Sequence, residues 1–366
     1  MTLELATAGE SHGPGLVAIL TGLPAGLALD RETIQHDLWR RQQGYGRSPR
    51  QQIETDQLEV LAGLRQGKTL GTPLALHVPN RDHKNWTWGM SPWQPEGEPQ
   101  GKGTKPVTLP RPGHADLSGV LKYEHDDVRN ALERASARHT AVFVAAGGVA
   151  KALLATIGIA VTGRVTEFGG ETELEKMHEA VDAARKDRDT LGGTVEVRAT
   201  GCPPGLGTYA VKEQRLDGRL AQALMAIQAV KAVEIGEGEA LARKRGSEAH
   251  DEIYKDEGGF HRRTNHAGGL EGGMTNGEEL VVRCSMKPLP TLMKPLQSVD
   301  LVTGEAGEAL VERSDVAAVE ALAVVAEAAV AFELAKAARE KFGGDAIGDF
   351  VAAHAAYLAR IDWSPR

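Results

Sequence analysis

The sequence has 366 residues and a formal net charge of −8 at pH 7, and 41% of its residues are hydrophobic but only 4% aromatic. This hydrophobic content excludes a largely disordered chain, and the acidic balance argues against a general nucleic-acid-binding or acidic-membrane-binding protein. The two cysteines, Cys202 and Cys284, form no CxxC motif, so we expect no metal site and interpret both as structural. The chain begins without a signal-peptide pattern, and its longest apolar stretch, 316–334, is interrupted by three glutamates. We therefore expect a cytoplasmic protein with no membrane partner.

The first predicted element is a strand over residues 3–8, and the heptapeptide GESHGPG follows it at residues 9–15. Its glycines permit unusual backbone angles and close approach of a ligand, and His12 can exchange a proton near neutral pH. Taken alone, the motif fits a polar turn that closes the strand equally well.

A short amphipathic helix is predicted from Asp30, as its N-cap, to Gly44, as the glycine that follows its C-terminus. Arg40 and Arg41 fall in its last turn, where the helix dipole favours cations. The basic loop GYGRSPR comes next, and residues 55–78 are predicted to form a strand, a glycine-containing turn and a second strand.

Residues 80–112 show neither helical nor strand periodicity and carry Trp86, Trp88 and Trp93 among prolines, glycines and charges. Long irregular segments inside compact domains are usually lids, binding loops or disordered segments, and of these we favour a partly mobile cover over an active site.

The second half of the chain mixes helices and strands without regular βα repeats. The expected helices cover 140–157, 171–191, 217–233 and a long Ala/Val-rich segment that Ser314 or Asp315 could cap and Gly343 and Gly344 would end; the expected strands cover 161–168, 192–201 and 278–288. Neither a GxGxxG dinucleotide motif after a strand nor a P-loop is present. The pattern favours an α+β fold in one domain, residues 1–366.

Two arginine clusters contrast with the acidic total. They contain Arg40, Arg41, Arg47 and Arg50 in the first cluster, and Arg111, Arg129, Arg134 and Arg138, beside His114 and His125, in the second. Guanidinium groups match the oxygens of carboxylates and phosphates. A solvated surface is the simpler explanation of most arginine pairs, but both clusters lie beside glycine-flanked histidines. This proximity favours a small polyanionic substrate.

Eight segments spread over the whole chain resemble, in order, the successive motifs of chorismate synthases. They are GESHGPG, RRQQGYGRSPRQQIETD, RPGHADLSGVLKY, ERASAR, AVKAVEIGEG, NHAGGLEGGMTNG, MKPLPT and VERSD. The resemblance implies helices sandwiched between antiparallel sheets and a homotetramer. It also implies the anti-1,4-elimination of phosphate from 5-enolpyruvylshikimate-3-phosphate to give chorismate, the last common step of the shikimate pathway to aromatic amino acids. This reaction requires reduced FMN, and NADPH or a separate flavin reductase would serve only to reduce the flavin.

The resemblance also implies roles for individual residues. His12 is expected to act as the acid for the leaving phosphate, His114 to attend the flavin, and Asp315 to act as a base near flavin N5. The implied substrate contacts are Ser11, Arg41, Arg47, Arg50, Arg111 and Arg138. The implied flavin contacts are Arg134, Ala135, Ser136, Gln228, Ala229, Gly272, Lys287, Pro288, Leu289, Pro290, Thr291 and Arg313. We expect the three tryptophans of 80–112 to pack within their segment or at a subunit contact rather than to stack on the flavin.

One position departs from the family pattern: where S-A-R-E is usual, this chain has His139 after Ser136, Ala137 and Arg138. We expect a helix that begins at Ser136, as N-cap, with its N-terminus facing an anionic ligand, and a slightly weaker helix start because the capping-box glutamate is missing.

Two other functions remain open at this point. A flavin oxidoreductase would consume NADPH without elimination, and a non-catalytic anion- or RNA-binding module would bind nucleic acid with a steep salt dependence.

Overall fold

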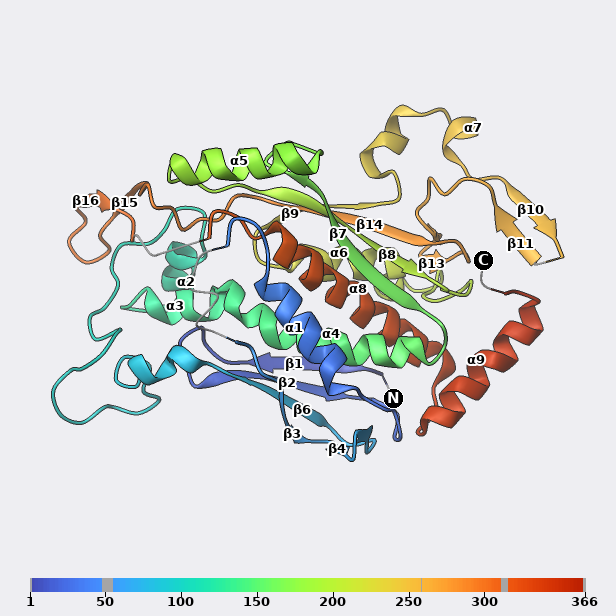
Figure 1. Cartoon of the computed structure of the whole chain (residues 1–366), viewed down its shortest axis with the longest axis horizontal. Helices are drawn as coiled ribbons and strands as arrows, with labels where there is room; N and C mark the ends of the chain where they lie inside the picture. The colour runs from blue at the N-terminus through green and yellow to red at the C-terminus, as the bar shows by residue number, and fades with distance from the viewer. Residues whose placement is uncertain (1, 48–54, 258, 311–314, 365–366) are drawn as a thin grey trace.

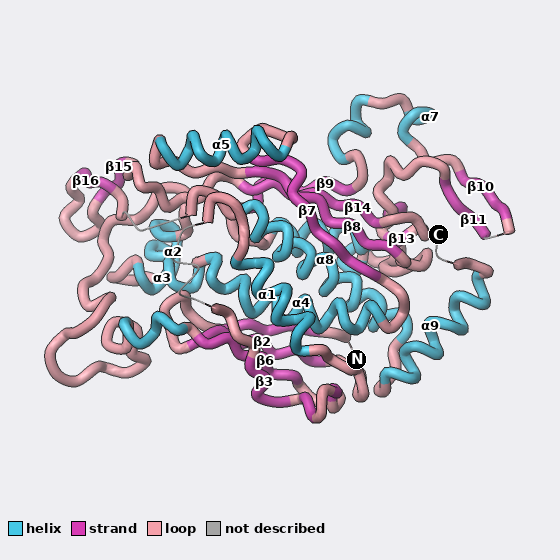
Figure 2. Tube along the Cα trace, viewed as in Figure 1, coloured by secondary structure: helices cyan, strands magenta, loops and turns pink. Residues whose placement is uncertain are grey.

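Two four-stranded antiparallel sheets enclose a layer of helices. The computed structural model describes residues 2–47, 55–257, 259–310 and 315–364, so Arg50, Arg313 and Ser314 lie outside the described residues. Figures 1 and 2 show the two sheets on opposite sides of the helices α1, α4 and α8. The predicted fold class, α+β with helices sandwiched between antiparallel sheets, is confirmed.

The first sheet comes from the N-terminal part of the chain. Its strands, in pairing order, are β1 (Glu4–Ala8), β2 (Gly15–Thr21), β6 (Leu74–Pro79) and β3 (Glu59–Ala62). Every second residue of β6, and Leu16, Ala18 and Leu20 of β2, is buried, as expected when one face of a sheet covers a core. The predicted first strand is confirmed, and the loop GESHGPG joins β1 to β2, so it lies at one end of this sheet.

The second sheet comes from the later part of the chain. Its strands, in pairing order, are β7 (Ala160–Phe168), β8 (Gly193–Thr200), β14 (Leu280–Met286) and β9 (Val230–Ile235). The charged helix α5 (Leu174–Lys186) lies on the outer side of this sheet (Figure 1). The helix predicted over 217–233 is wrong in its second half. Helix α6 ends at Met225, Ala229 takes a positive φ of 70°, and the β-branched residues that follow pair with β14 as β9.

The helical layer consists of α1 (Arg31–Gln42), α4 (Thr140–Ala155), α6 (Leu216–Met225) and α8 (Val319–Phe342). Helix α8 is apolar around most of its circumference, which is why it lies in the centre of the molecule. α4 packs on β2 and β6, α8 packs on β7 and β8, and the two helices pack on each other. They approach closely because Gly147 has no side chain: a Cβ there would lie 2.3 Å from Cβ of Ala328.

The ends of these helices test three capping predictions. The side chain of Asp30 accepts the N–H groups of Glu32 and Thr33, and Gly44 has φ +134°, so both predicted ends of α1 are confirmed. The capping role expected of Asp315 is wrong, because α8 begins four residues later and its N-cap, Ala318, makes no side-chain bond.

Ser136 marks a break between two helices. Helix α3 (Arg129–Ala135) ends there, Ser136 is extended, and its Oγ accepts the N–H of Arg138 at 3.3 Å. A 3-10 turn, η3 (Ala137–His139), then leads into α4. The predicted N-cap bond of Ser136 is therefore confirmed, but it caps the 3-10 turn, and the α-helix itself begins at Thr140.

The remaining elements lie outside the two four-stranded sheets and the helical layer. They are β4 (Leu64–Arg65), β5 (Lys68–Thr69), η2 (Arg81–Asn85), α2 (Asp116–Tyr123), η4 (Lys212–Gln214), η5 (Gly238–Arg243), α7 (Gly246–Ala249), β10 (Ile253–Asp256), β11 (Gly259–Arg262), β12 (Leu270–Glu271), β13 (Met274–Thr275), β15 (Gln297–Val299), β16 (Ala306–Glu308) and α9 (Ile347–Ile361). Figure 1 shows α2, β15 and β16 toward one end of the molecule and α7, β10, β11 and α9 toward the other. One hydrophobic cluster includes residues of both sheets and of the helices between them. Of the helices in the described ranges, none has the length and apolar character needed to cross a membrane.

Candidate active site

A cavity of about 650 Å³ lies where α4 and α8 begin, and it has the size of typical small-molecule sites, about 300–1,000 Å³. Thr140, at the first turn of α4, and Ala318, just before α8, both line it. The N-terminal ends of two helices therefore open on this space, and their N–H groups and dipoles favour a bound anion.

The side chains around the cavity are strongly cationic although the protein is acidic. The described lining includes six Lys and Arg residues but a single acid, Asp315; the cations are Arg41, Arg47, Arg111, Arg138, Lys231 and Lys287. His12 and His114 line the same space. The structure thus brings two arginines from each cluster, Arg41 and Arg47 with Arg111 and Arg138, and the two glycine-flanked histidines together around one cavity that can hold a polyanion.

His12 is held by a buried carboxylate that comes from a distant part of the chain. Its ring Nδ1 lies 2.9 Å from Oε1 of Glu133, and its backbone N–H donates to Oε2 of the same residue at 2.8 Å. Burial acts to raise the pKa of Glu133, but the bond with His12 and the charge of Arg129 hold it below its usual value. Because an ionised carboxylate only accepts, Nδ1 carries a proton, and Nε2 is the nitrogen through which His12 can exchange a proton with a ligand.

His114 has a corresponding arrangement with Asp116. Nδ1 of His114 makes a short hydrogen bond with Oδ1 of Asp116, while Oδ2 accepts Nε–H of Arg111 at 2.8 Å. Burial opposes ionisation of Asp116, but the bonds from His114 and Arg111 outweigh it and lower its pKa well below the usual range. Arg111 Nη2 also approaches His114 Nδ1 at 3.2 Å, but Nδ1 cannot accept a hydrogen bond while it donates to the carboxylate.

A third buried acid, Asp56, joins two arginines of the cavity. Oδ2 of Asp56 accepts Arg41 Nη2 at 2.5 Å, and Oδ1 makes a short bond with Arg138 Nη1. Burial alone would raise the pKa of Asp56, but the two guanidinium groups hold it below its usual value. Arg41 also donates to Thr140 at 3.3 Å and Arg138 to Asn80 at 2.9 Å, so both side chains are fixed before any ligand arrives.

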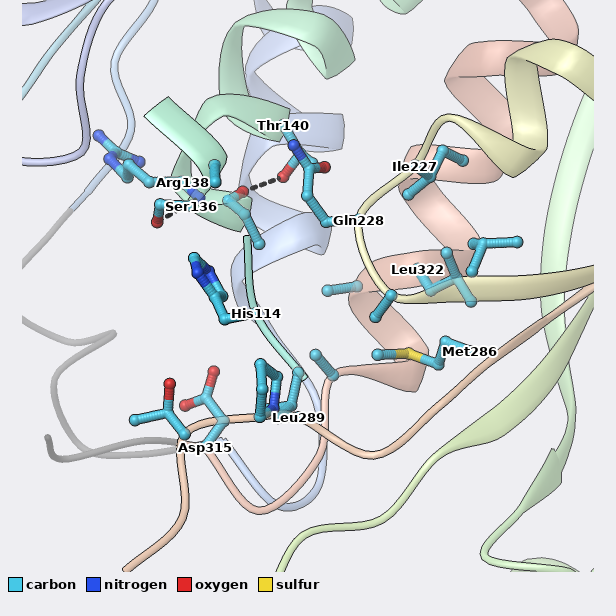
Figure 3. Close-up of a pocket in the computed structure, with 18 of the residues that line it drawn as sticks. His114, Ser136, Arg138, Thr140, Ile227, Gln228, Met286, Leu289, Asp315 and Leu322 are labelled. Carbon is cyan, nitrogen blue, oxygen red and sulfur yellow. Dashed lines mark hydrogen bonds between the residues drawn. The ribbon is translucent and has the colours of Figure 1, made fainter. Parts of the chain in front are cut away.

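Two further pairs complete the polar side of the cavity. Arg47 Nη1 lies 2.8 Å from Oδ2 of Asp315, so a ligand that binds Arg47 would compete with this carboxylate. Ser136 Oγ donates to Ser11 Oγ at 3.3 Å and thereby connects the helix break to the GESHG loop. Figure 3 shows His114 and Ser136 on one side of the cavity, facing Ile227, Met286 and Leu322 on the other.

The opposite side is formed by the turn between α6 and β9, the end of β14 with the segment that follows it, and the start of α8. Lys287 Nζ makes a short bond with the carbonyl of Gly113, and Arg111 Nη1 donates to Oγ1 of Thr291 at 3.2 Å. These bonds tie the KPLPT segment to the RPGH loop. Burial and the neighbouring Lys231 lower the pKa of Lys287 from its usual value.

Most residues predicted for the site line this cavity, although their roles stay predictions. Those that line it are Ser11, His12, Arg41, Arg47, Arg111, His114, Ala135, Ser136, Arg138, Gln228, Ala229, Lys287, Leu289, Pro290, Thr291 and Asp315. Among the predicted residues that the structure describes, three do not line it: Arg134, Pro288 and Gly272. Gly272 lies in the turn between β12 and β13, and Arg134 donates instead to the carbonyls of Thr7, at 3.0 Å, and Gly9, at 3.3 Å.

His139, the departure from the family pattern, lies beside Arg134. Its Nε2 is 2.7 Å from Oγ1 of Thr7, which also accepts Arg134 Nη2 at 3.1 Å. Burial, together with the charge of Arg134, lowers the pKa of His139 to about 4. The ring is therefore neutral at physiological pH and accepts the hydroxyl proton of Thr7.

Sequence reasoning missed the three carboxylates that hold the site. Asp56, Asp116 and Glu133 each lie inside a motif that was noted for its basic residues, namely RRQQGYGRSPRQQIETD, RPGHADLSGVLKY and ERASAR. An acid among arginines and histidines in such a motif was the available signal. Trp86 packs within its own segment as expected, and it also stacks on His12.

The fold and site define a class of protein: an enzyme with a helix layer between antiparallel sheets and a preorganised cationic cavity with two carboxylate-bound histidines. The sequence model of the chorismate synthase family matches residues 3–338. The chain is 51% identical to the chorismate synthase of Geobacter sulfurreducens, over 98% of this chain and 99% of that protein. It is 49% identical to that of Caldanaerobacter subterraneus subsp. tengcongensis, over 97% and 98%.

A solved structure is similar over the same extent. The protein described as "Crystal Structure of Chorismate Synthase" aligns with a TM-score of 0.79 and 37% identity, over 99% of both chains. The chain therefore belongs to the chorismate synthase family, and the family resemblance stated from the sequence is confirmed. It is an enzyme, a carbon–oxygen lyase that acts on phosphates.

Proposed function

We propose that this enzyme converts 5-enolpyruvylshikimate-3-phosphate to chorismate by anti-1,4-elimination of phosphate, with reduced FMN as its cofactor. The observation that carries the proposal is the cavity itself, where six cationic side chains and two carboxylate-oriented histidines surround one space in an acidic protein. The substrate carries a phosphate and two carboxylates, so its charges match this lining.

The residues present also suit the flavin. A flat aromatic ring system would find apolar contacts on the side formed by Ile227, Met286 and Leu322, and Lys287 and Lys231 lie near enough to face its anionic groups. Ala229 holds a backbone conformation that non-glycine residues rarely adopt, and such strain is common at ligand sites. When bound, the reduced flavin would supply electron density transiently to the substrate ring, and the reaction would leave it unchanged.

The chain's own groups would perform the remaining tasks. Arg41, Arg138 and Arg111 would bind the substrate oxygens in fixed positions, because Asp56 and Asp116 already hold their guanidinium groups. As the C–O bond to phosphate breaks and the phosphate takes the electron pair, Nε2 of His12 would donate a proton to it. Nε2 of His114 would likewise be the ring nitrogen that interacts with the bound flavin, because Asp116 holds its Nδ1.

Asp315 would take the proton from C6 of the substrate, which balances the elimination: one proton and one phosphate leave, and a new double bond forms. The ion pair between Asp315 and Arg47 supports this role in one respect. Binding of an anionic substrate group by Arg47 would loosen the pair and make the carboxylate available as a base.

The direct test is anaerobic. The purified protein, dithionite-reduced FMN and 5-enolpyruvylshikimate-3-phosphate are mixed, and chorismate absorbance and phosphate release are followed together. Equal amounts of both products, with the flavin still reduced at the end, are expected. Flavin binding without either product, or NADPH consumption without elimination, would instead favour an oxidoreductase.

We also propose a cytoplasmic homotetramer that depends on an outside source of electrons for its flavin. Apolar side chains exposed on the first sheet, Ile19 at 42% and Leu61 at 62%, support an association surface there. Analytical ultracentrifugation gives the number of subunits. Replacing dithionite with NADPH, with and without a separate flavin reductase, shows whether the enzyme reduces its own flavin.

A further inference from the structure

The indole ring of Trp86 lies against the imidazole of His12. Their centroids are 4.0 Å apart and their planes differ by 21°, so the two rings are stacked. Trp86 is only 7% exposed and His12 only 5%. The imidazole is therefore fixed in two ways, by the Glu133 carboxylate at its edge and by the indole on its face.

Arg129 links these two supports to each other. Its guanidinium carbon lies 5.0 Å from the centroid of the Trp86 ring, and its Nη1 is 3.4 Å from Oε1 of Glu133. Each of the four side chains, His12, Trp86, Arg129 and Glu133, therefore contacts two of the others. A guanidinium over an indole face is a favourable cation–π contact. Any rotation of the indole would thus disturb both the stack on His12 and the partner of Glu133.

The segment that follows β6 is folded around this tryptophan. Trp86 Nε1 donates to Asp82 at 2.9 Å, and a Cβ on Gly103 would lie 2.9 Å from the indole ring. The same segment also holds the backbone of the histidine loop: His83 Nδ1 lies 2.9 Å from the carbonyl oxygen of His12, and Asn80 Nδ2 donates to that of Gly13 at 2.8 Å.

This geometry differs from the cover predicted for residues 80–112. None of residues 80–110 lines the cavity, whereas three of them contact the loop that carries His12. His12 itself lines the cavity, whereas Asn80, His83 and Trp86 contact its loop without lining the cavity. Movement of this segment over the cavity stays a prediction.

We propose that Trp86 is a positioning residue for His12: its stacked ring holds the imidazole in the plane in which Glu133 binds Nδ1 and Nε2 meets the departing phosphate. This inference rests on the proposed function, since it concerns the proton that His12 delivers. Trp86 itself does not touch substrate. It prevents the imidazole from turning about its Cβ–Cγ bond, and a misdirected acid loses much of its catalytic effect.

The test compares Trp86→Leu, which fills much of the space without an aromatic face, with Trp86→Phe, which keeps the face. Trp86→Leu should lower kcat by about 10- to 100-fold and change the substrate KM by less than about threefold. Trp86→Phe should restore kcat to within about threefold of the original enzyme. Trp93→Phe is the matched control, because Trp93 belongs to the same segment and is 82% exposed; it should leave kcat and KM unchanged.

A double-variant cycle separates positioning from a general loss of structure. If Trp86 acts through His12, Trp86→Leu should add less than about twofold to the loss caused by Glu133→Gln, since both changes free the same imidazole. Independent, multiplying losses would overturn the inference, and so would Trp86→Phe as impaired as Trp86→Leu, or Trp86→Leu with unchanged kcat. Circular dichroism and flavin binding confirm that each variant is folded. If the original enzyme releases no phosphate, the proposed function itself is wrong. This outcome differs from the results that would overturn only the role of Trp86.

Discussion

The role of Asp56 can be tested by replacing it with asparagine. Asp56→Asn keeps the shape of the side chain but removes the charge between Arg41 and Arg138, and it turns an NH₂ group toward one of the two guanidinium groups. The carboxylate of Asp56 is fully buried, and the side chains of Arg41 and Arg138 are only 7% and 10% exposed. The substitution therefore leaves two buried cations without their shared anion.

The expected loss follows from this burial. Breaking a buried ion pair by removing one partner typically costs about 3–5 kcal/mol. Because the amide oxygen of the asparagine still accepts one hydrogen bond, we expect a cost at the lower end of this range, about 3 kcal/mol. Both arginines line the cavity, so inorganic phosphate can replace the missing charge. Phosphate at about ten times its dissociation constant contributes about 1.4 kcal/mol of stability, and the variant should bind it more tightly than the original protein.

The assay is urea-induced unfolding with and without 10 mM phosphate. Asp56→Asn should lose stability in buffer and regain at least about 1 kcal/mol more from phosphate than the original protein does. Asp37→Asn is the control. Asp37 is also a buried acid with two cationic partners, Arg40 and Lys151, but neither partner lines the cavity. It should lose stability without any extra gain from phosphate.

Two results would refute this reasoning. Equal stability of Asp56→Asn and the original protein would mean that the ion pairs contribute nothing net to the fold. An equal phosphate effect on both aspartate variants would mean that phosphate does not bind at the arginines that Asp56 holds.

Three further predictions concern the helix crossing, His139 and Glu133. Gly147→Ala should destabilise the protein by about 1–3 kcal/mol in urea unfolding, because its Cβ would lie 2.3 Å from Cβ of Ala328 in α8, whereas the Cβ of Gly148→Ala would lie no closer than 3.0 Å to Ile34, so that this change should cost less. Because the pKa of His139 is about 4 in the folded protein and near 6.5 in an unfolded chain, the unfolded state binds more protons between these values. Stability should therefore fall as the pH is lowered from about 6.5 to about 4, and His139→Gln should reduce this slope; an unchanged slope would contradict the prediction. Glu133→Gln should lower kcat by about 100-fold or more through loss of the His12 orientation, with little change in flavin affinity, and near-normal turnover would show that the carboxylate is dispensable.

Local signals in the sequence predicted local structure well. Asp30 and Gly44 mark the ends of α1 because capping bonds and a positive φ depend on neighbouring residues alone. The end of α6 was not predicted, since residues 226–233 are compatible with a helix until pairing with β14 makes them a strand. Pairing of this kind depends on residues about fifty positions away, which a local pattern does not reveal.

Site residues were predictable where a sequence motif marks them individually. They were not predictable where their role depends on contacts between motifs that lie far apart in the sequence. His12 and His114 stand out because glycines flank them, and both line the cavity. The partners that orient the site were missed because they act across long sequence separations: Glu133 reaches His12 over 121 positions, and Asp56 reaches Arg138 over 82. The stack of Trp86 on His12 was missed for the same reason.

The described walls of the cavity come from segments spread between Ser11 and Val325, including the loop between β1 and β2, strands β9 and β14 of the second sheet, and the helices between the sheets. A ligand that contacts these residues therefore connects segments of the chain that lie far apart in the sequence. No fragment that lacks either end of this range contains every described lining residue, so a nascent chain should be unable to retain its ligands until most of it has been made and folded. Conversely, a bound ligand should slow hydrogen exchange in both sheets at once, including strands that it does not touch.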